Sequence, residues 1–522
     1  MSRSAIEERL EAARAAQAAW WGLGLKARLQ VVRRLRGLLA EHGEQIAWEV
    51  AAASGCRDGA DGVGMTLAAE VVPLADAAKW LEKEAGEVLG ERKVGVRGRP
   101  LWLWGCRSVV KRLPWGVVLV IGAGNYPLML AGVQAMQGLV AGNAVVLKPG
   151  RKEGGGLVAS GWLERLWREA GLPAGVLTVI GESVEQVGGW MSGVREGSGS
   201  ATCPPAKPGA KGRAGRAGGG VDKVVLTGSS ATGRAVMRRC AETLTPVSLE
   251  LSGVDGCVVL PGADVGMAAE AIAWGLRLNS GATCIAPRRV LVHRSVEAAL
   301  GEALRQALAG VELAGLYPGS AERCGELVGE ALAGGAELWC GGDPRMKSAG
   351  FGGGSGPWVV GGVTSGMRLA VEDSFGPTAA LMAWETEEEL MELEAACPYG
   401  LGLSVFGPAG QAMGVVERFG GVGGVGSVVV NDLIAPTADP RLPFGGTGES
   451  GFGVTRGAEG LAGMTRPVSV TVRGGRGRPH YAPVGDKEVG LLGGYLRLVH
   501  AVGWRGKARA VVGLIRKRRS GV

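Results

Sequence analysis

The sequence lacks the features of metal-binding, secreted and membrane-spanning proteins. Its nine cysteines include no Cys-x-x-Cys pair, and with only four histidines they form no cluster that has the spacing of metal ligands. No stretch approaches the roughly 18 apolar residues of a membrane span. Residues 1–20 mix glutamate with arginine, unlike a signal sequence. These absences predict a cytoplasmic protein with reduced cysteines and no bound metal.

An excess of basic charge is also missing from most of the chain. The formal net charge is +8, but residues 473–522 contain 12 Lys/Arg and 2 Asp/Glu, so this tail alone carries +10. The preceding 472 residues therefore carry −2, and they show no basic face interleaved with aromatic residues. We expect no nucleic-acid partner and assign the basicity to the tail.

What is present is the composition and pattern of a globular α/β protein. Apolar residues make up 46% of the 522 residues and charged residues 20%, which excludes wholesale disorder. Residues 4–92 have the three- and four-residue apolar spacing of helices. Short apolar strands alternate with helices farther along the chain, at residues 117–121, 144–147, 176–180 and 223–226, and in a second series over 260–452. This alternation predicts parallel sheets with right-handed crossovers.

A low-complexity stretch over residues 197–220 interrupts the first series. Its 24 residues include eight glycines, four basic residues and no acidic residue. This composition is typical of an inserted surface loop, and a binding loop is the alternative interpretation.

One of the cysteines lies in a segment that suits nucleophilic chemistry. The segment Asn279-Ser-Gly-Ala-Thr-Cys284-Ile-Ala-Pro-Arg288 places it after a flexible Gly-Ala turn and before a strand. Taken alone, such a cysteine is more simply interpreted as a buried structural residue. Companion segments favour a catalytic interpretation, and they span residues 114–127, 142–149, 227–233, 249–253, 372–377, 431–432 and 442–446.

In their order and separation, these segments resemble the motifs of the aldehyde dehydrogenase superfamily, over residues 8–472. The resemblance implies an α/β fold with a Rossmann-like coenzyme domain, an α/β catalytic domain and a small β oligomerisation arm. The domains expected from it are residues 1–93 with 115–253 (coenzyme-binding domain), 94–114 with 465–473 (oligomerisation arm), 254–464 (catalytic domain) and 474–522 (basic C-terminal tail).

The resemblance also implies the catalytic residues. Attack of the Cys284 thiolate on an aldehyde gives a thiohemiacetal, whose charged oxygen is stabilised by the Asn125 amide and the backbone N–H of Cys284. After oxidation a thioester remains, and Glu250 activates the water that hydrolyses it. Without the cysteine, Asn125 would be a turn former before Tyr-Pro. The alternative for Glu250 is a strand-end carboxylate tied to backbone donors.

The cofactor implied by the resemblance is NAD or NADP. The cofactor-binding positions that it assigns are Lys148, Thr227, Gly228, Ser229, Gly233, Asp373 and Phe375. Where NAD-preferring relatives often have glutamate, this sequence has Arg151, which suits a 2′-phosphate and therefore predicts use of NADP, alone or alongside NAD. The alternative is that Arg151 is a solvated loop charge.

Departures from the family pattern keep two other functions open. Asp373 stands where the family usually has glutamate, and Ser252 and Val254 replace glycine and lysine of a common motif. These changes allow a catalytically weak scaffold or binding protein. A relative that passes the acyl group to coenzyme A is the other alternative, although Glu250 argues against it.

The tail has its own pattern. Leu492, Leu496, Val499 and Val502 form a helical stripe among basic residues. Such a segment suits either the surface of an anionic membrane, with the protein peripheral to it, or packing on the enzyme body. For partners, the resemblance implies a small aldehyde as substrate and a homodimer, or a dimer of dimers, formed through the arm.

Overall fold

Two compact units make up the chain in the computed structural model. One contains residues 1–92 and 111–468, and the other contains residues 93–110 and 469–522. The residues that the structure describes are 3–55, 57, 59–150, 155–181, 184–192, 220–313, 315–342, 356–422, 424–475, 478–481, 483, 485–505, 508, 511 and 512. Nearly all of the predicted inserted loop, residues 197–219, lies outside them.

Helices fill the first 90 residues of the larger unit, as predicted. They are α1 (Arg3–Gly22), α2 (Gly24–Ala53), α3 (Gly59–Thr66), the π-helical turn η1 (Leu67–Val71) and α4 (Val72–Leu89). The apolar spacing explains α2, because Val32, Leu35, Leu39, Ile46 and Val50 are all buried on one face.

A six-stranded sheet follows these helices. Its order is β17-β7-β6-β3-β4-β5, and every pair is parallel except β17 with β7. The strands are β3 (Val117–Ile121), β4 (Ala144–Lys148), β5 (Leu177–Val179), β6 (Lys223–Thr227), β7 (Val247–Glu250) and β17 (Gly451–Phe452). The strands predicted in this region and their parallel pairing are therefore confirmed.

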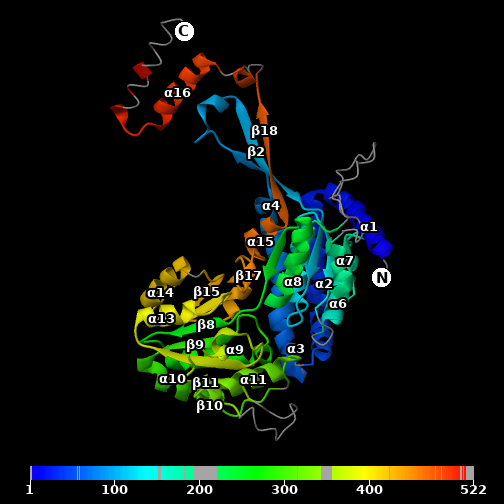
Figure 1. The fold of residues 1–522 in the computed structure, drawn as a ribbon. Helices are drawn as coiled ribbons and strands as arrows, with labels where there is room; N and C mark the ends of the chain where they lie inside the picture. Colours follow the sequence, from blue (N-terminus) through cyan, green and yellow to red (C-terminus); the bar gives the residue numbers. More distant parts are fainter. Residues whose placement is uncertain are drawn as a thin grey trace. The chain divides into compact units, whose positions relative to one another are not determined.

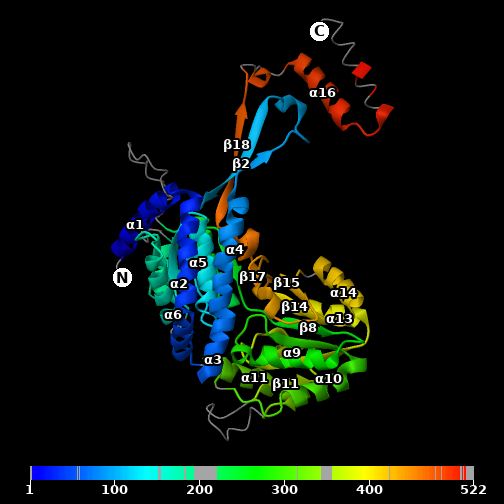
Figure 2. The ribbon, with the colours of Figure 1, turned by 180° about the vertical axis from the view of Figure 1, so that it is seen from behind.

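Helices cover both faces of this sheet. Side chains alternate along a strand, so Val118 and Val120 join one apolar cluster while Val117, Leu119 and Ile121 join the other. The first cluster includes α2, α4, α5 (Met129–Val140) and α6 (Gly156–Glu169), which stand together in Figure 2. The second includes α1, α7 (Val184–Ser192) and α8 (Ser230–Thr243), seen in Figure 1.

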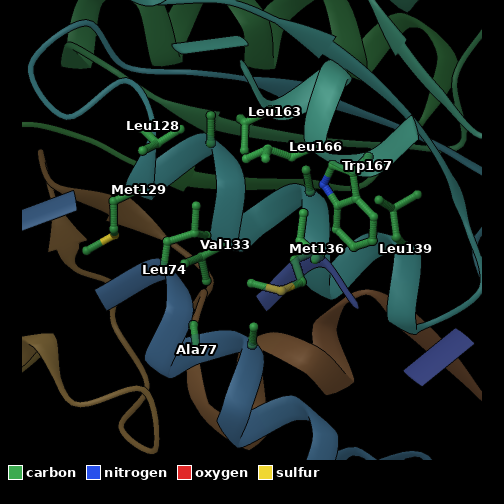
Figure 3. Packing of buried hydrophobic residues seen from close by; sticks show 14 of the residues in the cluster. Leu74, Ala77, Leu128, Met129, Val133, Met136, Leu139, Leu163, Leu166 and Trp167 are labelled. Carbon is green, nitrogen blue, oxygen red and sulfur yellow. The ribbon is translucent and has the colours of Figure 1, made fainter. Parts of the chain in front are cut away.

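Helix α5 is buried along its whole length. Figure 3 shows Met129, Val133 and Met136 of α5 packed between Leu74 of α4 and Trp167 of α6. A helix that is apolar on all sides is typical of a protein core, and each fully buried Leu or Met side chain contributes about 1.5–3 kcal/mol. This packing fixes the start of α5, which lies four residues after Asn125.

A seven-stranded sheet forms most of the rest of the larger unit, which also contains α15 (Gly457–Gly463) and a two-stranded sheet of β13 (Tyr399–Gly400) and β16 (Thr447–Gly448). The order of the seven-stranded sheet is β10-β11-β12-β9-β8-β14-β15, with only β10 and β11 antiparallel. The strands are β8 (Asp255–Val259), β9 (Pro287–His293), β10 (Glu337–Cys340), β11 (Trp358–Gly361), β12 (Thr378–Trp384), β14 (Gly402–Phe406) and β15 (Ser427–Val430). Two apolar clusters lie against this sheet. One includes side chains of α9 (Val265–Arg277) and α10 (Arg294–Ala307). The other includes side chains of α11 (Ser320–Ala333), α12 (Arg368–Val371), α13 (Glu387–Ala395) and α14 (Ala409–Val422).

The order of the six-stranded sheet creates a switch point beside β3. The chain runs from β3 outward through β4 to β5, and then returns to the other side of β3 with β6. Ligands of parallel α/β sheets bind at the carboxyl ends of strands at such a point. Here those ends lead into residues 122–125 after β3 and residues 228–229 after β6.

Residues 93–94, 106–110 and 469–473 of the smaller unit belong to a three-stranded sheet with the order β1-β2-β18. The strands are β1 (Arg92–Val94), β2 (Cys106–Pro114) and β18 (Thr465–Arg473), and helix α16 (Asp486–His500) follows. Within the described part of the chain, no helix combines the length and the apolar character needed to cross a membrane. The division into coenzyme, catalytic, arm and tail segments stays a prediction.

Candidate active site

Cys284 lies just before β9 and lines a cleft of about 860 Å³ in the larger unit. The turn before it is left-handed, since Asn279, Ser280 and Gly281 have φ values of 51°, 51° and 73°. A side chain at Gly281 would lie within 2.6 Å of the Gly376 backbone, so only glycine fits there. The thiol itself is half-buried. This tight turn holds the sulfur at the wall of the cleft.

The electrostatic surroundings keep the Cys284 sulfur protonated at rest. Burial raises the pKa of the thiol to about 12, and the negative charge of nearby Glu250 acts in the same direction. The carboxyl of Asp255 is buried beside the backbone of Gly402. Burial also raises the pKa of Asp255 well above its usual range, which favours the neutral acid. A base must therefore remove the thiol proton before the sulfur can attack.

Asn125 lies in the turn between β3 and α5 and also lines the cleft. The residue is 6% exposed, and its Nδ2 donates a hydrogen bond to the backbone oxygen of Ala282 over 2.9 Å. An amide nitrogen carries two hydrogens, so the second one is available to another acceptor. The structure thus places a hydrogen-bond donor beside the segment that carries Cys284.

Glu250 ends β7 and is 3% exposed. Its carboxylate accepts hydrogen bonds from Gln134 Nε2 over 3.0 Å, from Thr227 Oγ1 over 3.1 Å and from Thr455 Oγ1. Burial raises the pKa of Glu250 to about 7, although the buried Arg456 guanidinium and the hydrogen bonds from Thr227 and Gln134 lower it. A carboxylate with this pKa exchanges protons near neutral pH, as a general base must.

The start of α8 opens into the same cleft. Ser229 caps this helix, because its hydroxyl accepts a hydrogen bond from the backbone N–H of Thr232. The N-terminus of a 14-residue helix attracts anions through its free N–H groups and its dipole. Lys148, at the end of β4, adds a basic side chain to the lining. These groups fit the phosphates and sugar of a nucleotide.

The lining of the cleft also includes Asp373 and Phe375. Asp373 Oδ1 accepts hydrogen bonds from the Phe375 N–H over 2.8 Å and from Arg288 Nε over 3.3 Å. The Phe375 ring packs edge-on against Tyr317, with ring centres 5.2 Å apart. Arg288 also donates to the backbone oxygen of Gly281 over 2.5 Å. This arginine joins the 372–377 segment to the turn before Cys284.

A model of the aldehyde dehydrogenase family matches residues 1–195 and 217–470 of the chain. The chain belongs to the aldehyde dehydrogenase family. Its relatives include a 4,4'-diapolycopene aldehyde oxidase of Methylomonas sp, which is 30% identical over 412 residues, 77% of this chain and 70% of that protein. A geranial dehydrogenase of Castellaniella defragrans is 30% identical over 473 residues, 87% of this chain and 88% of that protein.

Further comparisons agree with this assignment. A benzaldehyde dehydrogenase [NAD(+)] of Pseudomonas putida is 31% identical over 368 residues, 67% of this chain and 66% of that protein. The crystal structure of an aldehyde dehydrogenase from Burkholderia cenocepacia, described as putative, superposes with a TM-score of 0.76 at 26% identity, covering 91% of this chain and 93% of that one. The predicted superfamily, fold class and enzyme class are therefore confirmed.

Most residues predicted for the site of this aldehyde dehydrogenase meet at one place. Those that line the cleft are Asn125, Lys148, Thr227, Gly228, Ser229, Cys284, Asp373 and Phe375. Glu250 lies behind Thr227, to which it is hydrogen-bonded. Gly233 does not line the cleft; a side chain there would meet Leu251 at 2.7 Å, so this glycine allows α8 to pack closely. Arg151 lies outside the described residues.

Several residues of the site carry no signal in the sequence. Gln134, Thr455 and Arg456 surround Glu250, and Arg57 contacts the backbone of Asn125. They come from segments that match none of the companion motifs or lie beyond their ends. Their positions depend on contacts between residues 68 to 205 positions apart in the chain. A local pattern cannot reveal such contacts.

Proposed function

We propose that this chain oxidises an aldehyde to a carboxylic acid, with Cys284 as the nucleophile, Asn125 as the oxyanion donor and Glu250 as the general base. The observation that carries the proposal is that Cys284 and Asn125 line one cleft while Glu250, with a pKa of about 7, lies behind its wall. The names of the relatives, all of which act on aldehydes, support the same reaction class.

The chain's own residues perform the proton and acyl chemistry. Glu250 accepts the thiol proton through a water molecule, and the sulfur forms a bond to the aldehyde carbon. The oxygen of this thiohemiacetal takes hydrogen bonds from Asn125 Nδ2 and the Cys284 N–H. After oxidation to the thioester, Glu250 releases this proton to the solvent and then removes a proton from a water that attacks the acyl carbon. The carboxylate leaves, and the sulfur regains its proton.

The cofactor is NAD or NADP, which supplies the two-electron acceptor for the oxidation. The residues proposed to hold it are Lys148, Thr227, Gly228, Ser229, Asp373 and Phe375. The name of the benzaldehyde-oxidising relative states NAD(+). The positively polarised start of α8 and the neighbouring Lys148 give this cleft the charge that a pyrophosphate requires.

Product analysis tests this function against the two alternatives. Mixing the protein with NAD or NADP and a panel of short, long and aromatic aldehydes should give the reduced cofactor and a free carboxylic acid. Formation of an acyl-coenzyme A thioester, only when coenzyme A is present, would favour the acyl-transferring alternative. Absence of any reduced cofactor over the whole panel would favour the scaffold.

The pKa of Glu250 predicts the pH dependence of hydrolysis. Because the carboxylate is the active form, the rate of acyl-enzyme hydrolysis should fall about tenfold per pH unit below about 7 and level off above it. The buried Arg456 guanidinium favours the carboxylate form of Glu250. Arg456→Gln should therefore raise the pKa of Glu250 and move this acidic limb, the pH range over which the hydrolysis rate falls, to higher pH. Single-turnover decay of the acyl-enzyme measures the limb, with Arg441→Gln, an exposed arginine, as the control. An unmoved limb in Arg456→Gln would refute this electrostatic link.

Cofactor preference remains a proposal that depends on Arg151. A guanidinium at this position can bind a 2′-phosphate, so we expect kcat/KM for NADP to equal or exceed that for NAD. Arg151→Glu should lower kcat/KM for NADP by about tenfold or more while changing the value for NAD little. If the wild-type enzyme and Arg151→Glu share one strong preference for NAD, Arg151 has no role in selection.

The smaller unit is proposed to serve assembly and membrane contact. Residues 93–110 and 469–522 contain 16 Lys/Arg and 2 Asp/Glu. Four aromatic residues of this unit are 63–80% exposed: Trp102, Trp104, Tyr481 and Trp504. Leu496, which belongs to the predicted stripe and lies on α16, is 60% exposed. Basic charge together with exposed aromatic and aliphatic side chains suits an anionic membrane surface.

Pairing through β2 and β18 would give a homodimer. Light scattering should then measure twice the 53.4 kDa mass of one chain.

Cosedimentation with vesicles tests the membrane contact. The full chain should pellet with vesicles that contain anionic lipid and remain in solution with neutral ones, because the attraction is electrostatic. A chain that ends at Gly474 lacks α16 and should pellet much less. Equal pelleting of the two chains would refute the proposed contact.

A further inference from the structure

A fully buried ion pair lies behind the turn that carries Asn125. Arg57, from the segment between α2 and α3, pairs with Glu70 of the π-helical turn η1, and the two residues are 2% and 0% exposed. A buried ion pair adds little net stability, because removing both charges from water costs about as much as their attraction returns. Net stability therefore does not explain why this ion pair is present. Glu70 lies in a π-helical turn, and such turns are frequent at functional sites.

Glu70 holds the start of helix α5. Its Oε2 accepts hydrogen bonds from the backbone N–H of Leu128 over 2.7 Å and of Met129 over 3.2 Å. A carboxylate at a helix N-terminus satisfies N–H groups that have no partner within the helix. Since Asn125 lies only three residues before Leu128, this contact fixes the chain on the helical side of Asn125.

Arg57 connects the Asn125 turn with the turn before Cys284. Its guanidinium donates to the backbone oxygen of Asn125 and, over 3.1 Å, to Asn279 Oδ1. Asn279 Nδ2 in turn donates to the same Asn125 oxygen over 3.0 Å and to the Ala282 oxygen over 3.1 Å. The Asn125 side chain bonds to that Ala282 oxygen as well. One arginine thus contacts both segments that form the proposed oxyanion site.

The contacts hold a conformation that the chain would otherwise resist. Asn279 and Ser280 are non-glycine residues with positive φ, a strained backbone conformation that persists only where the surrounding structure holds it. Removing Arg57 leaves the Asn125 and Asn279 oxygens short of a charged donor and allows these turns to relax. A misplacement of about 1 Å near reacting atoms can lower a rate by about 10²-fold.

We propose that Arg57 and Glu70 are positioning residues that fix the Asn125 amide relative to the Cys284 sulfur. The inference rests on the proposed roles of Asn125 and Cys284, and it adds a pair of residues that touches neither substrate nor cofactor. Arg57 acts through Asn125, so its contribution depends on the presence of the Asn125 side chain.

A double-mutant cycle between Arg57 and Asn125 tests this dependence. Asn125→Ala alone should lower kcat/KM for the aldehyde by about 10²–10³-fold, because an oxyanion donor is lost. Arg57→Met alone should lower it by about 10–10²-fold, with KM for the cofactor changed less than about threefold. In the Asn125→Ala background, Arg57→Met should cost less than about threefold, since the group it positions is already absent.

Matched variants separate positioning from general damage. Arg14→Met breaks the half-buried pair of Arg14 with Asp222, 2.6 Å apart, and any loss it causes should be equal in both backgrounds. If Arg57→Met does not fold, Arg57→Lys replaces it in the double-mutant cycle. Lysine keeps the positive charge, but its single nitrogen cannot donate to Glu70, Asn125 and Asn279 in the way that the branched guanidinium does. Thermal unfolding and cofactor binding show which variants are folded.

The outcomes distinguish this inference from the proposed function. If the Arg57 loss is the same with and without the Asn125 side chain, or if Arg57→Met and Arg57→Lys keep full activity, the positioning role is refuted. If Asn125→Ala itself keeps full activity, the proposed role of Asn125 fails, independently of Arg57. Coupled losses, in which the double variant resembles Asn125→Ala, support the inference.

Discussion

Cys284→Ser is expected to lower aldehyde oxidation by about 10⁴-fold or more, the loss typical of removing a covalent nucleophile. A hydroxyl is a far weaker acid than a thiol, so the base that serves Cys284 cannot activate serine to the same extent. An ester would also replace the thioester as the intermediate. Cofactor binding should be unchanged, because the residues proposed to hold the nucleotide are intact.

The measurement is the steady-state rate of cofactor reduction, with binding of the cofactor followed separately by protein fluorescence. Cys340→Ser is the matched control, since Cys340 is also half-buried but lies on β10 and does not line the cleft. It should retain activity within about twofold. Turnover by Cys284→Ser within tenfold of the wild-type rate would remove Cys284 from the mechanism.

Glu250→Gln is expected to lower steady-state turnover by about 10²–10⁴-fold, the contribution of a general base. The loss should fall mainly on hydrolysis. At high pH, hydroxide in the cleft can replace the carboxylate in removing the thiol proton, so the oxidation step should persist. Stopped-flow measurement should then show a burst of about one reduced cofactor per site, followed by a slow phase.

A different pattern would change the assignment of Glu250. If Glu250→Gln loses the burst at every pH while the protein remains folded, the residue acts before the thioester forms. If it keeps the wild-type steady-state rate, Glu250 is a structural carboxylate held by Gln134, Thr227 and Thr455. Glu49→Gln, which replaces an exposed glutamate that accepts a hydrogen bond from Trp162 Nε1, is the control for loss of a carboxylate elsewhere.

The parts of the fold and site that follow local patterns were predictable from the sequence. The strands alternate side chains between two helix-covered faces, and the parallel pairing follows from the helices between them. The ends of β3, β4 and β6 supply Asn125, Lys148 and Thr227 because each motif continues directly from its strand.

The surroundings of these residues were not predictable, for a physical reason. Glu250 takes its hydrogen bonds from Gln134 and Thr455, which are 116 and 205 residues away in the chain. Only the packing of α5 and the 444–456 segment brings them together. The pattern around Gly233 was likewise ambiguous, because a glycine serves equally to admit a ligand or to let Leu251 pack against a helix.

The most direct test of the account is the mass of the protein trapped during turnover. Glu250→Gln, mixed at high pH with the cofactor and an aldehyde that it oxidises and then quenched in acid, should gain the mass of one acyl group. Peptide mapping should place that group on Cys284. Oxidation of the aldehyde without any acyl adduct, or with the adduct on another residue, would contradict the account.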